Sequence, residues 1–324
     1  MMSSSSKRLL LVEDDDQNAE DYQNWLIAKG YEVKRAKAAE DALAMALDFR
    51  PDATVLDLQI PSQPGRTDED TKHGLRALEG LRRQDPFLPI VVATAHKDNS
   101  ELMREVMRRN HGGHFLFKSE GDLKGNLLRA VALALESPAY IGSRAVRDFE
   151  VLVEAKEKEE RYRDFIKKHW RILLGPKYRE CHSPHEIGRG AKVDLFFVRH
   201  DGFSDLWELK RPDQDVFKAY NDRLHQSDEC ARAVGQLVEY IDMAEKQHSG
   251  PSSYEAIRGI SVALHRPRGF VVIGRRKDER EKDRLALENS FFAGITIYTY
   301  DDLIENAYEV LKFLRDYRNG NSSG

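Results

Sequence analysis

The sequence predicts an α/β protein with two domains, and three observations lead to this prediction. The chain has 324 residues, which is more than one hydrophobic core usually serves. Short apolar runs alternate with amphipathic stretches up to about residue 136, and a different pattern follows a charged segment at residues 147–163. We therefore expect a doubly wound, five-stranded parallel domain at residues 1–136, a charged connecting helix or linker at 137–160, and a second α/β domain at 161–324.

The composition is that of a globular chain, with 33% charged and 40% hydrophobic residues. No apolar run reaches the roughly 18 residues that a membrane span needs, and the run at residues 9–12 is too short for a signal peptide. We expect a cytoplasmic protein with no membrane partner. The two cysteines, Cys181 and Cys230, predict neither a disulfide framework nor a metal site. A net charge of −4 does not indicate a polyanion binder, although a local basic surface can still bind nucleic acid.

In the first domain, the apolar runs predict five strands and the amphipathic runs predict five helices. The strands are expected near residues 9–12, 31–35, 53–56, 90–93 and 114–117. The helices are expected near residues 18–29, 38–48, 75–83, 100–109 and 123–135. Gly30 suits a helix C-cap, and Pro51 and Pro89 stand just ahead of strands. Strict alternation of strand and helix favours a parallel sheet covered on both faces.

Polar side chains follow four of these strands. Glu13 and Asp14 follow the first strand, Asp57 the third, Thr94 the fourth and Lys118 the fifth. The carboxyl ends of parallel strands meet at one edge, where three carboxylates repel one another unless they share a cation such as Mg²⁺. A lysine and a hydroxyl opposite them could hold the oxygens of a phosphoryl group. Each residue alone would be a turn or helix cap, but together they predict phosphorylation of Asp57, the nucleophile, with Mg²⁺ bound by the three carboxylates.

Four stretches of this domain closely resemble the response-regulator receiver family over residues 7–136. They are LLLVED at 9–14, VLDLQIP at 55–61, VATA at 92–95 and FLFK at 115–118. The resemblance implies phosphotransfer to Asp57 from a histidine kinase or a small phosphodonor, and switch roles for Thr94 and Phe115. The chain departs from the family twice. Residues 62–73 form a long polar segment, and Ser119 follows Lys118 where the family usually has proline.

The rest of the chain predicts a connection and a second mixed domain. The charged run at 147–163 predicts a solvated connecting helix, or alternatively a helix that pairs between two copies of the protein. A helix then extends through Trp170. Further strands are expected near residues 192–199, 205–210, 270–274 and 296–300, and helices near 228–245 and 303–317.

A second group of chemical residues lies around a predicted hairpin. Asp201-Gly202 is a turn signal, and a hairpin centred there places Asp194 opposite Leu209, between Glu208 and Lys210. Two carboxylates and an ammonium are what metal-assisted phosphodiester cleavage requires. Asp194 and Glu208 would hold Mg²⁺, and Lys210 would orient water or stabilise the transition state. The alternative is a surface hairpin that happens to expose Asp, Glu and Lys.

The surrounding sequence favours the catalytic interpretation. Gln236 and Tyr240 share one face of the following helix. Asp194, the ELKRP run at 208–212 and this helix resemble the PD-(D/E)XK nuclease superfamily. Residues 268–275 and 298–303 resemble more specifically the Shedu family of anti-phage nucleases. The resemblance implies a restriction-endonuclease-like core, Mg²⁺-dependent DNA cleavage, a homo-oligomer, metal ligation by Asp194 and Glu208, a catalytic Lys210 and an auxiliary Gln236.

Two further points concern this predicted nuclease domain. Val193 stands where the superfamily's namesake has proline, and a first-helix glutamate of such sites is either Glu159 or Glu160. Several cations could neutralise DNA phosphates or could simply be solvated beside acidic neighbours: Arg189, Arg211, Arg266, Arg268, Arg275, Arg276 and Lys277.

We therefore predict a phosphorylation-controlled, Mg²⁺-dependent DNA endonuclease, in anti-phage defence. One alternative is a non-cleaving DNA-binding or regulatory output protein of a two-component system. Another is that the receiver acts only as an assembly module.

Overall fold

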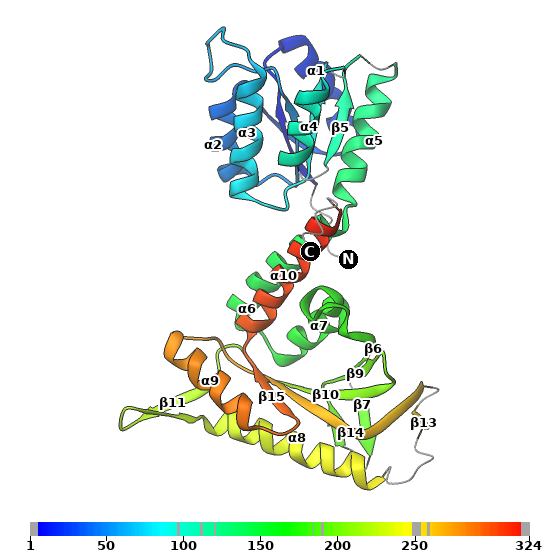
Figure 1. The fold of residues 1–324 in the computed structure, drawn as a ribbon, viewed down its shortest axis with the longest axis vertical. Coiled ribbons are helices and arrows are strands. Elements are labelled where there is room, and N and C mark those ends of the chain that lie inside the picture. The colour runs from blue at the N-terminus through cyan, green and yellow to red at the C-terminus, as the bar shows by residue number, and fades with distance from the viewer. Residues whose placement is uncertain are drawn as a thin grey trace. The chain divides into compact units, whose positions relative to one another are not determined.

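The structure is a computed structural model that describes residues 6–95, 98–110, 113–119, 121–183, 185–188, 191–247, 254–257 and 260–318. The chain forms two compact units, Met1–Ser143 with Lys312–Gly324, and Arg144–Leu311. Helices α6 (Pro138–Glu154) and α10 (Tyr300–Arg318) each include residues of both units (Figure 1). In the described part of the chain, no helix is both long and apolar enough to cross a membrane.

The first unit contains the predicted five-stranded parallel sheet, in the order β2-β1-β3-β4-β5. Its strands are β1 (Arg8–Val12), β2 (Glu32–Ala36), β3 (Ala53–Asp57), β4 (Ile90–Thr94) and β5 (His114–Phe117). Its helices are α1 (Asp16–Ala28), α2 (Ala39–Phe49), α3 (Thr71–Gln84), α4 (Ser100–Arg109) and α5 (Leu123–Leu135). The prediction of a doubly wound fold is confirmed.

Two hydrophobic layers hold this sheet between its helices. Side chains of α1 and α5 pack on one face, and side chains of α2, α3 and α4 pack on the other. Strands β3 and β4 lie in the middle and are buried along their whole length. Because both faces are covered, these strands are continuous apolar runs, and the first polar groups appear where the strands end.

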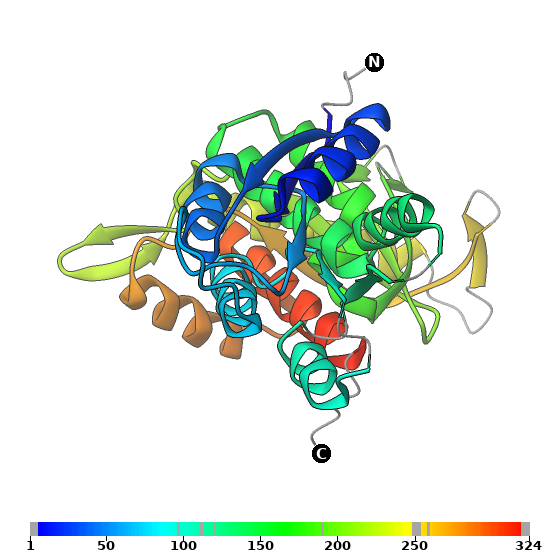
Figure 2. The same ribbon diagram turned by 90° about the horizontal axis from the view of Figure 1, so that it is seen from above.

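The second unit is built on a six-stranded mixed sheet. Its order is β13-β14-β10-β9-β6, with β15 paired to β14. The strands are β6 (Tyr178–His182), β9 (Leu195–Arg199), β10 (Phe203–Leu209), β13 (Tyr254–Ile257), β14 (Ile260–Val272) and β15 (Ile295–Tyr298). Two small hairpins stand apart from it, β7 (His185–Gly188) with β8 (Ala191–Val193), and β11 (Phe217–Tyr220) with β12 (Arg223–Gln226). The β11–β12 hairpin extends away from the sheet (Figures 1 and 2).

Helices cover this second sheet and supply its core. The long helix α8 (Asp228–Gln247) packs Ala233 and Leu237 against Leu206 and Val271 of the central strands. Rings fill the other face, where Trp207 stacks on Phe270 with centroids 4.8 Å apart. Along the chain, helix α7 (Glu159–Leu173) and the short 3-10 helix η1 (Gly175–Lys177) come before the first strand of this sheet. Helix α9 (Glu279–Phe291) follows β14 and comes before β15 in the sequence.

The charged segment differs from its prediction as one connecting helix. Helix α6 ends at Glu154, Lys156 has a left-handed backbone with φ of 52°, and α7 begins at Glu159. The segment is also not solvated all round, because Phe149 and Val153 are buried. These two apolar residues are four apart and so share one face of α6, which gives the helix a core contact that charge counting overlooks.

The predicted register of the hairpin formed by β9 and β10 is wrong by one residue. Trp207 pairs with Leu195, so Glu208, not Leu209, stands across from Asp194. The hairpin turns through three residues, 200–202, with Gly202 at φ of 85°, instead of the two-residue turn that was assumed. Such a loop takes a left-handed residue at its end, which Gly202 supplies without strain.

The start of α10 also differs from its prediction. The helix begins at Tyr300, inside the segment predicted as the end of a strand. The Thr299 backbone amide and hydroxyl both donate to Asp302 Oδ2, at 2.6 and 2.7 Å. The Asp302 amide donates back to the Thr299 hydroxyl at 3.2 Å, which completes a capping box.

Candidate functional sites

The first candidate site lies at the carboxyl ends of β1, β3 and β5. Lys118 Nζ donates to Glu13 Oε2 at 2.8 Å and to Asp57 Oδ2 at 2.7 Å. Glu13 is 1% exposed and Asp57 is 6% exposed, so one ammonium compensates two buried carboxylates. The Gln59 amide donates to the other oxygen, Asp57 Oδ1, at 3.1 Å.

The ionisation of this pocket is strongly perturbed. Burial, followed by the charge of Asp57, raises the pKa of Glu13 to about 7. Burial and the Asp57 charge likewise raise the pKa of Asp14. Burial opposes the charge on Lys118, but the carboxylates of Asp57 and Glu13 outweigh it and raise the pKa of the ammonium. The pocket therefore has more negative charge than its lysine can neutralise.

The acidic pocket fits a hard divalent cation. Glu13, Asp14 and Asp57 each offer an oxygen, and the three atoms lie within 4.8 Å of one another. Glu13 Oε1 is buried and has no hydrogen-bond partner among the residues that the structure describes. A buried, unsatisfied carboxylate oxygen is costly, and Mg²⁺ or one of its waters would satisfy it.

The two predicted switch residues lie on β4 and β5. Thr94 is buried, and its carbonyl accepts a hydrogen bond from the Lys118 amide at 2.9 Å. Phe115 is half-buried and stacks on Phe117 with centroids 6.2 Å apart. Both predicted switch residues thus lie on the strands that lead into the pocket.

The long polar segment after β3 is folded and reaches the pocket. Asp68 accepts hydrogen bonds from the Ser62 amide at 3.0 Å and from its hydroxyl at 2.7 Å. The next residue, Glu69, lines the pocket together with Asp14 and Asp57. The sequence marked this segment as unusual but did not place Glu69 at the site.

The second candidate site lies where β10 ends in the second unit. Lys210 Nζ donates to Glu208 Oε1 at 2.8 Å, and Glu208 is 4% exposed. The Leu209 amide donates to Asp194 Oδ2 at 2.9 Å, which fixes Asp194 beside the strand. Arg163 of α7 lies 3.6 Å from Asp194 Oδ1. The structure thus brings together the three predicted residues and adds an arginine that the sequence did not indicate.

Electrostatics at this second site resemble those of the first. Burial, followed by the charge of Asp194, raises the pKa of Glu208 to about 7. Burial also raises the pKa of Glu159, whose carboxyl is close enough to interact with Lys210 and Asp194. Glu159 is half-buried whereas Glu160 is exposed, so the structure favours Glu159 as the first-helix acid.

Divalent metal would be held here by Asp194 and Glu208, whose mutual repulsion a cation would relieve. Within the described part of the chain, however, only the Glu13 pocket brings three potential ligand atoms within 4.8 Å. The second site is therefore a two-carboxylate site, with Glu159 nearby.

Gln236, the predicted auxiliary residue, and most of the cations predicted to bind phosphate have partners outside the Glu208–Lys210 pair. Gln236 Nε2 donates to the Tyr240 hydroxyl at 2.5 Å, one helical turn along α8. No hydrogen bond found among the described residues joins Gln236 to Glu208 or Lys210. Carboxylates of the same unit engage five of the cations: Arg211, Arg268, Arg275, Arg276 and Lys277. Arg189 and the side chain of Arg266 lie outside the described residues.

Two family models match the chain at these sites. The response regulator receiver domain matches residues 9–124, and the C-terminal part of Shedu protein SduA matches residues 156–304. The chain therefore contains a response regulator receiver domain and a Shedu SduA C-terminal domain. The predicted resemblances to the response-regulator receiver family and to the Shedu family are confirmed.

Solved receiver domains resemble the first part of the chain. A CheY-like receiver domain from Methanospirillum hungatei is 22% identical, covering 41% of this chain and 95% of its own, with a TM-score of 0.35. A putative response regulator from Chloroflexus aurantiacus is 28% identical, with coverage of 40% and 98% and a TM-score of 0.34. A receiver domain of a Pseudomonas aeruginosa sensor histidine kinase, with magnesium in its active site cleft, is 24% identical, with coverage of 41% and 100% and a TM-score of 0.35. None of the curated proteins compared with this chain matches it.

Proposed function

We propose that this chain is a DNA endonuclease that depends on Mg²⁺ and is controlled by phosphorylation of Asp57. The observation that carries the proposal is the buried Glu208, paired with the half-buried Lys210 beside Asp194, at the end of the central strand of a Shedu SduA C-terminal domain. A perturbed carboxyl pKa next to a lysine is typical of catalytic sites. By the same family resemblance, we propose phage DNA as the substrate and a homo-oligomer as the working form.

The cleavage chemistry follows from the charges at the second site. Bound by Glu208 and Asp194, Mg²⁺ would polarise the scissile phosphate and lower the pKa of water. Lys210 keeps its proton, because Glu208 raises the pKa of the ammonium, and its Nζ can donate to a phosphate oxygen or orient the attacking water. Arg163, which lies 3.6 Å from Asp194 Oδ1, can release Asp194 and bind a DNA phosphate in its place.

The receiver chemistry moves a phosphoryl group from a donor nitrogen or oxygen to a carboxylate oxygen. Asp57 Oδ attacks the phosphorus of a phosphohistidine or acyl phosphate, and the bond from phosphorus to the donor breaks. Mg²⁺ in the pocket of Glu13, Asp14 and Asp57 would neutralise the charge that develops on the phosphoryl oxygens. Lys118, which now spans Glu13 and Asp57, is placed to bind one of those oxygens. When Lys118 binds a phosphoryl oxygen, its ammonium leaves Glu13, and this loss of a hydrogen bond is a structural change that phosphorylation can impose on the domain.

The decisive experiment incubates the full chain with plasmid and linear DNA and Mg²⁺, with and without acetyl phosphate. Wild type is compared with Glu208→Gln and Asp57→Asn. We expect metal-dependent cutting that is lost in Glu208→Gln, and an effect of acetyl phosphate that is lost in Asp57→Asn. DNA binding without any cutting in the presence of phage DNA would overturn the endonuclease proposal and favour a non-cleaving output protein. Cutting that ignores acetyl phosphate would leave the receiver as an assembly module.

A further inference from the structure

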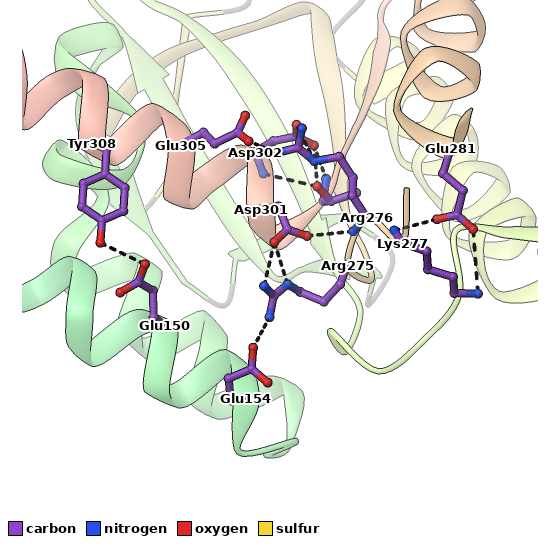
Figure 3. Close-up of polar contacts among 11 residues, drawn as sticks. Glu150, Glu154, Arg275, Arg276, Lys277, Glu281, Asp301, Asp302, Glu305 and Tyr308 are labelled. Carbon is purple, nitrogen blue, oxygen red and sulfur yellow. Dashed lines mark hydrogen bonds and ion pairs between the residues drawn. The ribbon is translucent and has the colours of Figure 1, made fainter. Parts of the chain in front are cut away.

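Arg275 joins two helices of the second unit in a way that the cleavage chemistry does not use (Figure 3). Its Nη1 lies 2.6 Å from Glu154 Oε1, at the last residue of α6. Its Nε and Nη2 lie 2.8 and 2.7 Å from Asp301 Oδ1, in the first turn of α10. One planar guanidinium thus bridges carboxylates of two helices, a task to which its fixed fork of donors is suited.

The first turn of α10 is in turn fixed to the segment after β14. The Tyr300 amide donates to the Gly274 carbonyl at 3.1 Å, and the Arg276 amide donates to Asp301 Oδ2 at 2.7 Å. The Gly274 amide donates to the Arg211 carbonyl at 3.2 Å, directly after Lys210. The start of α10 and the end of β10 therefore share one network of backbone hydrogen bonds.

Tyr300 connects this network to the catalytic lysine itself. Its side chain is fully buried, and its hydroxyl donates to the Lys210 carbonyl at 2.8 Å. Its ring lies 5.1 Å from Tyr162 of α7 and 6.0 Å from Phe149 of α6, measured between centroids. Because the Lys210 amide also donates to the Val272 carbonyl at 2.8 Å, the lysine backbone is held from two sides.

The end of α6 is tied to α10 at a second place. The Tyr308 hydroxyl donates to Glu150 Oε1 at 2.9 Å, one helical turn before Glu154 (Figure 3). The neighbouring cations act differently. Arg276 pairs with Glu305, and Lys277 pairs with Asp215 at 2.7 Å, so among these three cations Arg275 alone engages α6.

We infer that Tyr300 is a positioning residue for Lys210, and that the Glu154–Arg275–Asp301 bridge makes this positioning respond to helix α6. The inference rests on the proposed function and adds to it a route of control. Helix α6 begins at Pro138, three residues after α5 of the receiver ends at Leu135. A displacement at the start of a helix is carried to its end, where Glu154 holds Arg275. The exposed pair Glu154–Arg275 can be broken at low cost, as a switch requires, whereas the buried Tyr300 contact persists.

The positioning role is tested with Tyr300→Phe in the full chain. Loss of the hydroxyl frees the Lys210 carbonyl, so we expect kcat for DNA cleavage to fall roughly tenfold with KM changed less than about twofold. Tyr162→Phe is the matched control, because its hydroxyl accepts from the Glu157 amide at 2.8 Å and does not contact Lys210. Equal kcat values for the two variants would overturn the positioning role.

The route of control is tested by hydrogen exchange, which does not require cleavage. Exchange at residues 207–211, 274–276 and 298–302 is measured with Mg²⁺, with and without acetyl phosphate. We expect acetyl phosphate to change exchange in wild type, and Glu154→Gln and Arg275→Gln each to reduce that change by up to about fivefold. The double variant should show no larger reduction of the exchange change than either single variant does, because both substitutions remove the same bridge. Glu279→Gln, which breaks only an exposed pair with Lys282, is the control.

The outcomes separate this inference from the proposed function. If wild type does not cut DNA but its exchange response is reduced in Glu154→Gln and kept in Glu279→Gln, the route of control through the bridge stands, whereas the endonuclease proposal fails and the positioning role fails with it. If cutting responds to acetyl phosphate while exchange at 298–302 does not, the route through α10 is wrong. Additive effects of Glu154→Gln and Arg275→Gln would also overturn it.

Discussion

The two acidic sites are built from the same kinds of side chain, but in different numbers. Each has a buried glutamate with a pKa of about 7 and a lysine whose ammonium donates to it, Glu13 with Lys118 and Glu208 with Lys210. In the receiver pocket, one oxygen from each of three carboxylates lies within 4.8 Å of the others, and Glu13 Oε1 has no partner in the described part of the chain. At the second site, Asp194 is already bonded to the Leu209 amide. The first site therefore has the arrangement of a preorganised cation site, whereas the metal proposed at the second site would require Asp194 to rearrange or DNA to supply an oxygen.

The largest effect should come from removing Lys210, the lysine of the second site for which we propose a catalytic role. Lys210→Ala is expected to lower the DNA cleavage rate by about a hundredfold or more, because an oriented cation at the transition state is lost. The initial rate of plasmid cleavage at saturating Mg²⁺ measures it. Lys282→Ala, which removes an exposed lysine paired with Glu279, is the control and should cut like wild type. A Lys210→Ala rate within tenfold of wild type would contradict the assignment.

How much of each site the sequence could predict depends on the range of the interactions. Asp57 and Lys118 were predictable because Asp57 ends a strand, Lys118 directly follows one, and parallel strands end at one edge. Glu208 and Lys210 were predictable from their alternation along β10. Glu69 was not, because a loop reaches the pocket through its own folding around Asp68.

In the second unit, one register was predicted wrongly, one choice stayed open and one contact was not predicted, each for a definite physical reason. The register at Asp194 depended on whether the hairpin loop had two or three residues, which Asp201-Gly202 alone does not decide. The choice between Glu159 and Glu160 depended on the rotation of α7 about its axis, which packing sets. The Tyr300 contact joins residues 90 positions apart, beyond any local pattern.

Metal affinity provides a sharper test of the difference between the sites. We expect the receiver to bind Mg²⁺ about tenfold more tightly than the second site, because it has one more carboxylate and a buried oxygen to satisfy. Calorimetric titration of wild type, Asp57→Asn and Glu208→Gln separates the two. The tighter phase should disappear in Asp57→Asn and remain in Glu208→Gln. The reverse pattern would show that the second site is the preorganised one.

The pH dependence of Mg²⁺ binding should follow from Glu13. Its carboxyl must lose a proton to bind metal, and burial together with Asp57 raises its pKa from 4.5 to about 7. Apparent Mg²⁺ affinity of the receiver is therefore expected to fall roughly eightfold between about pH 7.5 and about pH 6.0. Titrations of Glu208→Gln at both pH values measure the receiver alone. A constant affinity would mean that Glu13 is ionised throughout.

The same shift predicts an opposite trend for the stability of the metal-free protein. Between about pH 4.5 and about pH 7 the folded state binds more protons at Glu13 and Glu208 than the unfolded chain does. The contribution of these groups to stability therefore decreases as pH rises through that window. Thermal melting in a chelator checks the sign, and Glu13→Gln should make the dependence weaker.

The smallest effect concerns the two adjacent glutamates at the start of α7. Glu159 interacts with Lys210 and Asp194, whereas Glu160 is exposed. We expect Glu159→Gln to lower the cleavage rate about threefold to fivefold, mainly at limiting Mg²⁺, because a nearby charge is lost but both principal ligands remain. Glu160→Gln is the matched control and should stay within about twofold, as expected for an exposed charge. If Glu160→Gln had the larger effect, α7 would have to present its other face to the site when metal and DNA bind.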